Sequence, residues 1–266
     1  MEALALVGSL SDIALLLGLS ATRVAVAFLL VPIFTNELIP SMVRNAMFIA
    51  IALLSLMLQP APAPLVLSTW QWLTLFAKEA FIGGAIGFMT AGVLWAFEAA
   101  GALIDTKAGT TQAQVQDPMS GQTTTLTGAL LGRLASMVFM AAGGFMVMIG
   151  TLLESYTLWP VRAPFPSLVQ GGMRLFEMEF GRIMALTLLI AAPALVLMYV
   201  IEGVLGLINR FAQQLNVFSL SASLKAVAAI WIVWVQLVTL VQLLQDDLLT
   251  RGGVAIQSLR ALLGGG

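Results

Sequence analysis

The sequence predicts an all-α fold, that of a multi-helix integral membrane protein, and three observations support this class. First, 60% of the 266 residues are hydrophobic and 9% are charged, whereas ordinary soluble domains have about 45–50% apolar and about 25% charged residues. Second, several charge-free windows approach or reach the roughly 20 residues that a helix needs to cross a bilayer. Third, no window alternates with the period of two that membrane β-strands show. The composition leaves one alternative open, a chain buried in a large apolar assembly.

The N-terminal half predicts a series of apolar elements separated by a proline-rich turn. Residues 13–34 form the first element, which Arg23 interrupts. Residues 45–77 carry no charge. The prolines within residues 59–64 cannot lie in a helix interior, so we expect a turn there and a new element after it. Residues 80–97 form the next charge-free window.

The C-terminal half predicts three long windows and two interruptions. Residues 134–153, 183–201 and 226–245 are free of charge. Segment 105–125 is mostly Thr, Gln, Gly, Asp and Ser, and a structureless loop of that length is usually functional or disordered. Segment 154–182 has three prolines and mixed charge. It predicts a second connection, with room for a short amphipathic helix.

The charged residues give no membrane orientation. The 12 cations are scattered among 13 acids, so the positive-inside rule assigns no side. The first charges are acidic, so we expect no cleavable signal peptide, which begins with a positive region. Arg23 lies near the middle of an apolar window, where a charge costs about 2.5–3.5 kcal/mol on insertion scales. A buried ion pair and a helix break that admits water explain it equally well.

The residue types provide almost no support for an enzyme. Cysteine and histidine are both absent, which removes thiolate nucleophiles, disulfides, and the commonest general base and metal ligand. We therefore expect no catalytic residue, no cofactor and no metal, and the net charge of −1 gives no basic surface for nucleic acid. Glu98 and Asp105 are seven residues apart and share one face if a single helix continues through both. A solvated helix end is favoured over a catalytic pair.

Small residues recur at helical spacing in one apolar window. Gly83 and Gly87 form a Gly-x-x-x-Gly pattern, and Gly92, Ala96 and Ala100 follow as a second series at four-residue steps. Faces of this kind let helices approach closely. We expect tight helix packing here, either within the chain or with other subunits.

Several motifs together resemble one protein family. The longest spans residues 202–221, with the sequence Glu-Gly-Val-Leu-Gly-Leu-Ile-Asn-Arg-Phe-Ala-Gln-Gln-Leu-Asn-Val-Phe-Ser-Leu-Ser, followed by Lys225. The shorter ones are Gly-Ala-Leu-Ile-Asp at 101–105, Asp-Pro at 117–118, Ser-Gly at 120–121, Ser-Tyr at 155–156 and Trp-Pro at 159–160. In this order, over nearly the whole chain, they resemble the FliR/SctT family, the export-gate subunits of flagella and of type III secretion injectisomes.

The resemblance favours the injectisome branch, SctT/YscT/HrcT-like, over flagellar FliR. Flagellar members usually carry His after a Gly-Gly pair, and here Phe145 follows that pair. The family commonly has Pro just before Lys225, where this chain has Ala-Ser-Leu. A proline-set kink is therefore not implied at that point.

The resemblance implies a core export-gate subunit whose helical hairpins pack into a hetero-oligomeric helical assembly. Residues 1–182 would form an N-terminal helical part and residues 183–266 a C-terminal helical hairpin, with no separate soluble domain. The implied partners are FliP/SctR-like and FliQ/SctS-like small membrane proteins, a FlhB/SctU-like switch protein, membrane lipid and unfolded secreted substrates. The complex is expected in the bacterial inner membrane, displaced largely toward the periplasm, with a central channel that passes the unfolded substrates.

The resemblance also implies which residues matter. The polar segment at about residues 106–122 is expected to plug the closed channel, through Thr106, Lys107, Gly109, Thr110, Gln112, Gln114, Gln116, Asp117, Pro118 and Met119. Packing or inter-subunit contacts are expected from Arg23, Glu202, Arg210, Asn216 and Lys225. Considered without the resemblance, the polar segment is better explained as a solvated connection.

Two other functions stay open. A stand-alone small-solute transporter or channel would use Arg23, Glu98 and Glu202 to line a polar path. It would be stable as a monomer or as a closed symmetric oligomer. A membrane enzyme would require a substrate-dependent role for Glu98 or Asp105.

Overall fold

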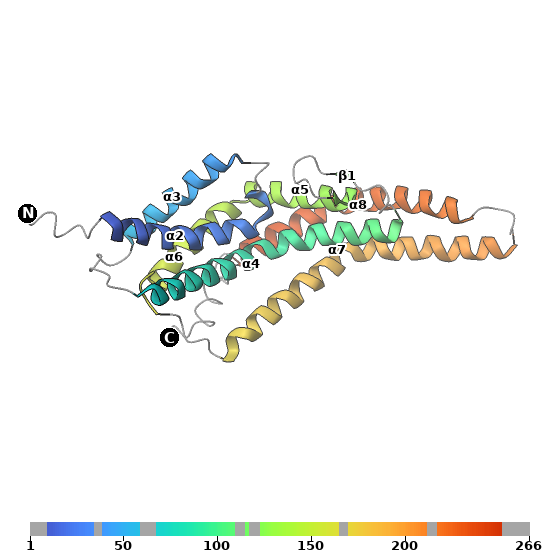
Figure 1. Ribbon diagram of the computed structural model, residues 1–266. Helices are drawn as coiled ribbons and strands as arrows, with labels where there is room; N and C mark the ends of the chain where they lie inside the picture. Colours follow the sequence, from blue (N-terminus) through green and yellow to red (C-terminus); the bar gives the residue numbers. More distant parts are fainter. Residues whose placement is uncertain are drawn as a thin grey trace, which may run out of the picture. The chain divides into compact units, whose positions relative to one another are not determined.

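A computed structural model of the chain describes residues 10–34, 39–58, 68–109, 115–116, 123–164, 170–211 and 217–251. The first elements are α2 (Leu10–Leu30), the short 3-10 helix η1 (Pro32–Phe34), α3 (Ser41–Met57) and α4 (Thr69–Ala108). The next are the strands β1 (Val115–Gln116) and β2 (Thr123–Thr124), then α5 (Leu126–Ala141), α6 (Gly144–Leu158), α7 (Gln170–Phe211) and α8 (Val217–Arg251). Helices make up nearly all of the described chain, which confirms the all-α class (Figure 1).

The described residues form two compact units that do not follow the order of the chain. The first unit draws on Met1–Ala91, Gly143–Met178 and Thr250–Gly266, and the second on Gly92–Ala142 and Glu179–Leu249. Both α4 and α7 contribute to each unit. The division into residues 1–182 and 183–266 stays a prediction.

In the first unit, α2 packs against α3 and against the N-terminal part of α4. Two glycines allow the close approach to α4. A Cβ at Gly83 would collide with the backbone of Arg23, and a Cβ at Gly87 would lie 2.7 Å from the carbonyl oxygen of Ala27. Gly83 and Gly87, four residues apart on α4, thus contact Arg23 and Ala27, four residues apart on α2. The close helix packing expected from these glycines is confirmed, and it occurs within the chain.

In the second unit, the C-terminal part of α4 packs against α5 and α7. A Cβ at Gly101 would lie 2.5 Å from the carbonyl oxygen of Thr127, in the first turn of α5. A Cβ at Gly92 would lie 2.8 Å from the Cδ1 atom of Ile183 on α7. Ala96 and Ala100 on the same helix are fully buried. The whole stretch of small residues therefore lies at helix contacts.

Two of the predicted boundaries around α4 and α7 are wrong. Segments 65–77 and 80–97 were expected as separate elements, yet α4 runs without a break through the charged residues between them. It does so because Lys78 and Glu79 are fully buried and paired, so they do not mark an exit to water. The connection expected at residues 154–182 is also shorter, since α6 extends to Leu158 and α7 begins at Gln170.

The window at residues 134–153 was expected as one element and instead holds parts of two helices. α5 ends at Ala141 and α6 begins at Gly144. Gly143 stands at the break with a φ of +81°. Glycine adopts this left-handed conformation without the steric cost that other residues meet.

Four of the described helices are long and apolar enough to cross a membrane, judged by length and composition. They are α2, through its window Ile13–Leu30, and α4, α7 and α8. α5 and α6 together would make a fifth span if they are counted as one. α8 continues from Val217 to Arg251, so the stretch before Lys225 carries no break, as its lack of proline implies.

Candidate functional site

The polar segment leaves α4 through a glycine turn. Gly109 follows the end of α4 with a φ of +80°. Its N–H group donates to the carbonyl oxygens of Asp105 (3.1 Å) and Thr106 (3.3 Å). A left-handed residue in this place closes the last helical turn, and glycine takes the conformation at little cost. The segment expected to begin at residue 105 therefore begins at Gly109, because Asp105, Thr106 and Lys107 are helical.

Asp105 ties the end of the segment back to α4. Its Oδ2 atom accepts a hydrogen bond from the backbone N–H of Thr127, and its Oδ1 atom accepts one from the Thr127 hydroxyl, both at 2.6 Å. Both residues are buried. Thr125, the N-cap residue of α5, makes no capping hydrogen bond with its own side chain. The Asp105 carboxylate takes over this role and meets the positive end of the α5 dipole.

Asp105, one of the two carboxylates considered as a catalytic pair, is engaged in contacts within the chain. Both oxygens of Asp105 are engaged by Thr127, whereas a general acid or base needs its carboxyl group available to a substrate. Asp105 is a helix-capping residue. Glu98 lies about two turns before Asp105 on the same face of α4, and its side chain lies next to Gly132 of α5.

A cluster of two lysines and one glutamate joins α4, α7 and α8 beside the polar segment. Lys107 Nζ lies 2.8 Å from Oε2 of Glu202, and Lys225 Nζ lies 2.9 Å from Oε1 of the same carboxylate. Lys225 also donates to the carbonyl oxygen of Lys107 at 3.3 Å. The ring of Tyr199 lies 4.1 Å from Lys107 Nζ, a cation–π contact. The last turn of α4 is thus fixed by contacts with both α7 and α8.

A short two-stranded ladder lies within the polar segment. β1 and β2 pair antiparallel, with Val115 opposite Thr124 and Gln116 opposite Thr123. Sequence analysis did not predict these strands, since two residues on each side are too few to show a period of two.

Apart from Arg23, Glu202 and Lys225, the expected site residues fall into three groups. Thr106, which is exposed, and Lys107 lie in the last turn of α4, Gly109 follows it, and Gln116 lies in β1. Arg210 is exposed in the last turn of α7. The remaining expected residues lie outside the described part of the chain: Thr110, Gln112, Gln114, Asp117, Pro118, Met119 and Asn216.

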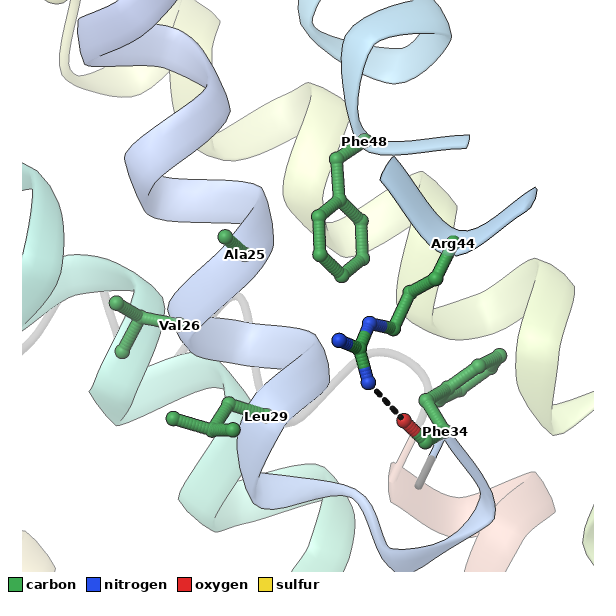
Figure 2. Close-up of a pocket in the computed structure, with 6 residues that line it drawn as sticks. All are labelled: Ala25, Val26, Leu29, Phe34, Arg44 and Phe48. Carbon is green, nitrogen blue, oxygen red and sulfur yellow. Dashed lines mark hydrogen bonds between the residues drawn. The ribbon is translucent and has the colours of Figure 1, made fainter. Parts of the chain in front are cut away.

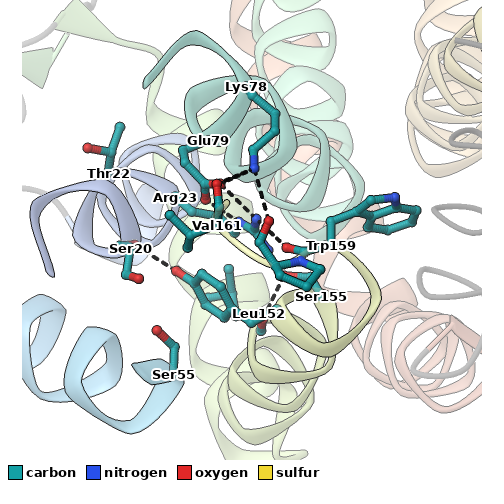
Figure 3. Close-up of polar contacts among 12 residues, drawn as sticks. Ser20, Thr22, Arg23, Ser55, Lys78, Glu79, Leu152, Ser155, Trp159 and Val161 are labelled. Atoms are coloured by element: carbon teal, nitrogen blue, oxygen red, sulfur yellow. Dashed lines mark hydrogen bonds and ion pairs between the residues drawn. The ribbon is translucent and has the colours of Figure 1, made fainter. Parts of the chain in front are cut away.

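Arg23 belongs to a different site, in the first unit, where it forms a buried ion pair (Figure 3). Its Nε and Nη2 atoms donate to the two carboxylate oxygens of Glu79 at 2.7 and 3.0 Å. Nη1 donates to the Ser155 hydroxyl at 2.9 Å, and Nη2 also donates to the Trp159 carbonyl oxygen at 3.0 Å. The Tyr156 ring lies 4.1 Å from the guanidinium carbon. Of the two explanations for Arg23, the structure shows the ion pair.

Lys78 extends this network to the segment that follows α6. Its ammonium group lies 3.0 Å from Oε1 of Glu79. It also donates to the carbonyl oxygens of Pro160, Val161 and Ala163 at 2.6–3.1 Å. The carbonyl groups of this non-helical segment thereby gain hydrogen-bond partners. Unpaired carbonyl groups would be costly in the interior.

Sequence analysis identified Arg23 but missed its partners. Glu79 is 56 residues away and Ser155 is 132 residues away, so no local spacing connects them. One signal was available. Lys78 and Glu79 are the charged residues that interrupt an otherwise apolar stretch, and adjacent charges inside such a stretch indicate a buried partner.

The fold and these contacts are those of a multi-pass membrane protein with long apolar helices. Buried charges are paired inside its helical units, and a polar segment is anchored at both ends. Residues 14–250 match the family described as bacterial export proteins, family 1. The chain belongs to this family, and the FliR/SctT resemblance is confirmed.

Individual relatives from several bacteria cover most of the chain. Yop proteins translocation protein T of Yersinia pestis is 32% identical over 211 residues, which are 78% of this chain and 80% of the relative. Surface presentation of antigens protein SpaR of Salmonella typhimurium is 29% identical over 216 residues, 81% of this chain and 80% of the relative. Flagellar biosynthetic protein FliR of Bacillus subtilis is 24% identical over 206 residues, 76% of this chain and 78% of the relative.

Proposed function

We propose that this chain is a core export-gate subunit of a type III protein secretion system of the injectisome kind. It would reside in the bacterial inner membrane and form part of the channel that passes unfolded substrate proteins. Membership of the export family supports an export role. The names of the Yersinia and Salmonella relatives, with the lower identity to the flagellar protein, support the injectisome branch.

The observation that carries the proposal is the polar segment anchored at its base. A channel for unfolded chains must block ions at rest and open wide enough for a polypeptide, which suits a movable element. Residues rich in Gly, Thr and Gln change conformation without exposing a large apolar surface. Asp105 with Thr127, and Lys107 with Glu202, hold the two ends of that segment. We infer that residues 106–122 plug the closed pore from this fixed base.

The exposed apolar surface of the second unit supports burial against partner subunits. Large side chains on α7 and α8 are exposed, with Phe211 at 87% and Trp234 at 73% of their full accessible surface. We assign this surface to the two small export-gate proteins, SctR-like and SctS-like, with a SctU-like switch protein beside them. Displacement of the complex toward the periplasm would also account for the missing positive-inside bias.

Deletion of residues 109–116 tests the plug. It removes β1 and the start of the segment, and it leaves Asp105, Lys107 and their partners in place. We expect the reconstituted export-gate complex to assemble and to conduct ions well above the wild-type background in a planar bilayer. A replacement of the same residues by eight Gly and Ser residues is the matched control for segment length. Unchanged conductance in an intact complex with the deletion would contradict the plug.

Native mass spectrometry of the tagged protein, extracted in mild detergent from its own cell, tests the assembly. One copy bound to several copies of two smaller membrane proteins is the expected result. A monomer or homo-oligomer under gentle extraction would instead favour a stand-alone small-solute transporter or channel.

A further inference from the structure

Two lysines from different helices share one carboxylate at the end of α4. One oxygen of Glu202 lies 2.8 Å from Lys107 Nζ, and the other lies 2.9 Å from Lys225 Nζ. All three residues belong to the second unit. Because each lysine has its own oxygen, the carboxylate keeps a cation in contact when either lysine leaves it.

The two lysines differ in their access to water. The side chain of Lys107 is 26% exposed, whereas that of Lys225 is 13% exposed. The more exposed ammonium group loses less when its ion pair breaks, because hydration replaces part of the lost interaction. The ring of Tyr199, 4.1 Å from Lys107 Nζ, gives the same ammonium group a second partner. The Lys107 pair is therefore the less costly of the two to break.

The places of the three residues in the fold support the same order. Glu202 and Lys225 lie on α7 and α8, which the pair of Arg182 and Asp247 also joins, at 2.6 Å. Lys107 lies instead in the last turn of α4. The second contact from this turn to α8 is a long one, 3.3 Å from Lys225 Nζ to the Lys107 carbonyl oxygen. The turn can thus separate from α7 while the two ion pairs between α7 and α8 stay in place.

The contact just before this turn is buried and short. Asp105 accepts two hydrogen bonds of 2.6 Å from Thr127 on α5, and both residues are buried. Breaking these bonds would leave a charged carboxylate unpaired in the interior, which is costly. Asp105 is therefore expected to stay bound when Lys107 moves, so the displacement is confined to the residues after Asp105.

We propose that the Lys107–Glu202 pair is a releasable contact. Lys107 leaves the carboxylate, Lys225 stays on it, and the last turn of α4 moves away from α7 without loss of the α7–α8 pairing. The release itself does not depend on a pore, whereas its use in opening one rests on the plug proposed above. In that use it frees the first end of the polar segment, while Asp105 and Thr127 keep the second end in place.

Electron paramagnetic resonance of the purified chain in mild detergent tests the release. The sequence has no cysteine, so Thr106→Cys, at an exposed position in the last turn of α4, takes a single nitroxide label. In this labelled parent, Lys107→Gln should raise the ratio of mobile to immobile label about threefold, the size expected for one partly exposed ion pair. Lys107→Arg keeps the charge and should restore the parent ratio.

Salt tests whether the contact also opens in the parent itself. Raising sodium chloride from about 0.05 M to about 0.5 M screens a partly exposed ion pair. The ratio of mobile to immobile label should therefore rise with salt in the labelled parent and stay constant in Lys107→Gln. An equal response to salt in both would overturn the proposal, because the response would not come from the Lys107–Glu202 pair.

Arg44 in the first unit provides the matched control. It is partly buried and donates to the Phe34 carbonyl oxygen at 3.4 Å, beside an apolar cavity of about 190 Å³ (Figure 2). Arg44→Gln changes the net charge as Lys107→Gln does, without altering the Glu202 cluster. It should leave the label ratio unchanged. A rise as large as that in Lys107→Gln would overturn the proposal, because the label would then report charge alone.

Melting temperatures give a second, independent measurement and identify any variant that fails to fold. Lys107→Gln should lower the melting temperature by about 1 °C or less, whereas Lys225→Gln, which removes a pair between α7 and α8, should lower it by roughly 3–5 °C. Equal lowering by the two variants, or an unchanged label ratio in Lys107→Gln, would overturn the proposal. Ion conductance of the reconstituted complex then separates the release from the plug. A mobile label in Lys107→Gln without added conductance would support the release and contradict its use in the plug.

Discussion

Arg23 illustrates how one buried charge organises the first unit. An arginine without a partner in an apolar helix would be costly. Here its donors reach a carboxylate on α4, and a hydroxyl and a backbone carbonyl at the C-terminal end of α6. Tyr156 covers the guanidinium and donates its own hydroxyl proton to the carbonyl oxygen of Ser20 at 2.6 Å. The cost of burying Arg23 is offset only when α2, α4 and α6 are all in place, so the network specifies one arrangement of these helices.

Loss of the shared carboxylate is expected to destabilise the chain most. Glu79→Gln leaves Arg23 and Lys78 buried without a counter-charge, whereas Arg23→Met leaves the Lys78–Glu79 pair intact. Removing one partner of a buried ion pair costs about 3–5 kcal/mol. For Glu79→Gln we expect a melting temperature lower by roughly 10 °C, measured for the purified chain in mild detergent. Arg23→Met should lower it less.

An exposed carboxylate provides the control for that series. Glu177 lies on the exposed side of α7, and Glu177→Gln makes the same isosteric change away from the network. Its melting temperature should equal that of the wild type. If Glu79→Gln matched Glu177→Gln, the network would contribute nothing measurable to stability.

At the level of single elements, α4 is the helix on which both units are built. Its small residues face other helices at successive turns: Gly83 and Gly87 toward α2, Gly92 toward α7, and Gly101 toward α5. Lipid tails are as apolar as the side chains of these helices, so the hydrophobic effect does not drive helix association in lipid. Helices there associate through close packing instead. At Gly83, Gly87 and Gly101 the absent Cβ makes room for the backbone of the neighbouring helix, and at Gly92 it makes room for the Ile183 side chain.

Two adjacent glycines of α4 should respond in opposite ways to the same substitution. A Cβ at Gly83 would collide with the Arg23 backbone, whereas a Cβ at Gly84 would meet only Cγ1 of Val26 at 3.8 Å, an ordinary contact. Gly83→Ala should cost about 1–3 kcal/mol through overpacking. Gly84→Ala should be neutral or stabilise by up to about 1 kcal/mol through helix propensity. Melting temperatures compare the two, and equal effects would show that α2 and α4 do not pack as closely as described.

Within the second unit, α7 and α8 are joined by two ion-pair rungs. Arg182 pairs with Asp247 at 2.6 Å and Glu202 pairs with Lys225 at 2.9 Å. The two ion pairs are separated by similar numbers of residues on each helix, from Arg182 to Glu202 on α7 and from Lys225 to Asp247 on α8. This is the spacing that two antiparallel helices packed side by side require. The Glu202 rung also includes Lys107, so it connects this hairpin to the base of the polar segment.

Charge-neutral substitutions should separate contacts within the chain from contacts between subunits. Glu202→Gln removes the negative charge that both lysines share and replaces one of its two acceptor oxygens by an N–H donor, so we expect a lower melting temperature for the isolated chain and less assembled complex. Arg210 is exposed at the end of α7, so Arg210→Gln should leave the isolated chain unchanged and reduce recovery of the complex. Pull-down of partner subunits with the tagged chain measures the second effect. Full assembly and secretion in both variants would show that neither residue supports the complex.

Much of the molecule follows from local features that the sequence displays directly. Apolar windows of about 20 residues, the small-residue face of α4 and the polar segment before α5 are all set by composition over short distances. The turn expected at the prolines of residues 59–64 lies outside the described residues. The family was likewise recognisable from the motif at residues 202–221 with Lys225 and the shorter motifs before it. Predictions from local features were wrong where a tertiary contact or a backbone break was not visible in the neighbouring residues. The charges at Lys78 and Glu79 suggested an end to a helix, and the smooth apolar run through Gly143 concealed a break.

The sequence by itself determined that this protein is helical, apolar and a member of an export family, because hydropathy, the absence of a strand period and contiguous motifs are properties of neighbouring residues. Only the tertiary structure decided that Glu79 neutralises Arg23, that Asp105 caps α5, and that Glu202 holds the base of the polar segment. These contacts join residues 22 to 95 positions apart. The physical reason is that a charge in an apolar interior needs a partner, but the chain can supply that partner from any helix that folding brings within about 3 Å.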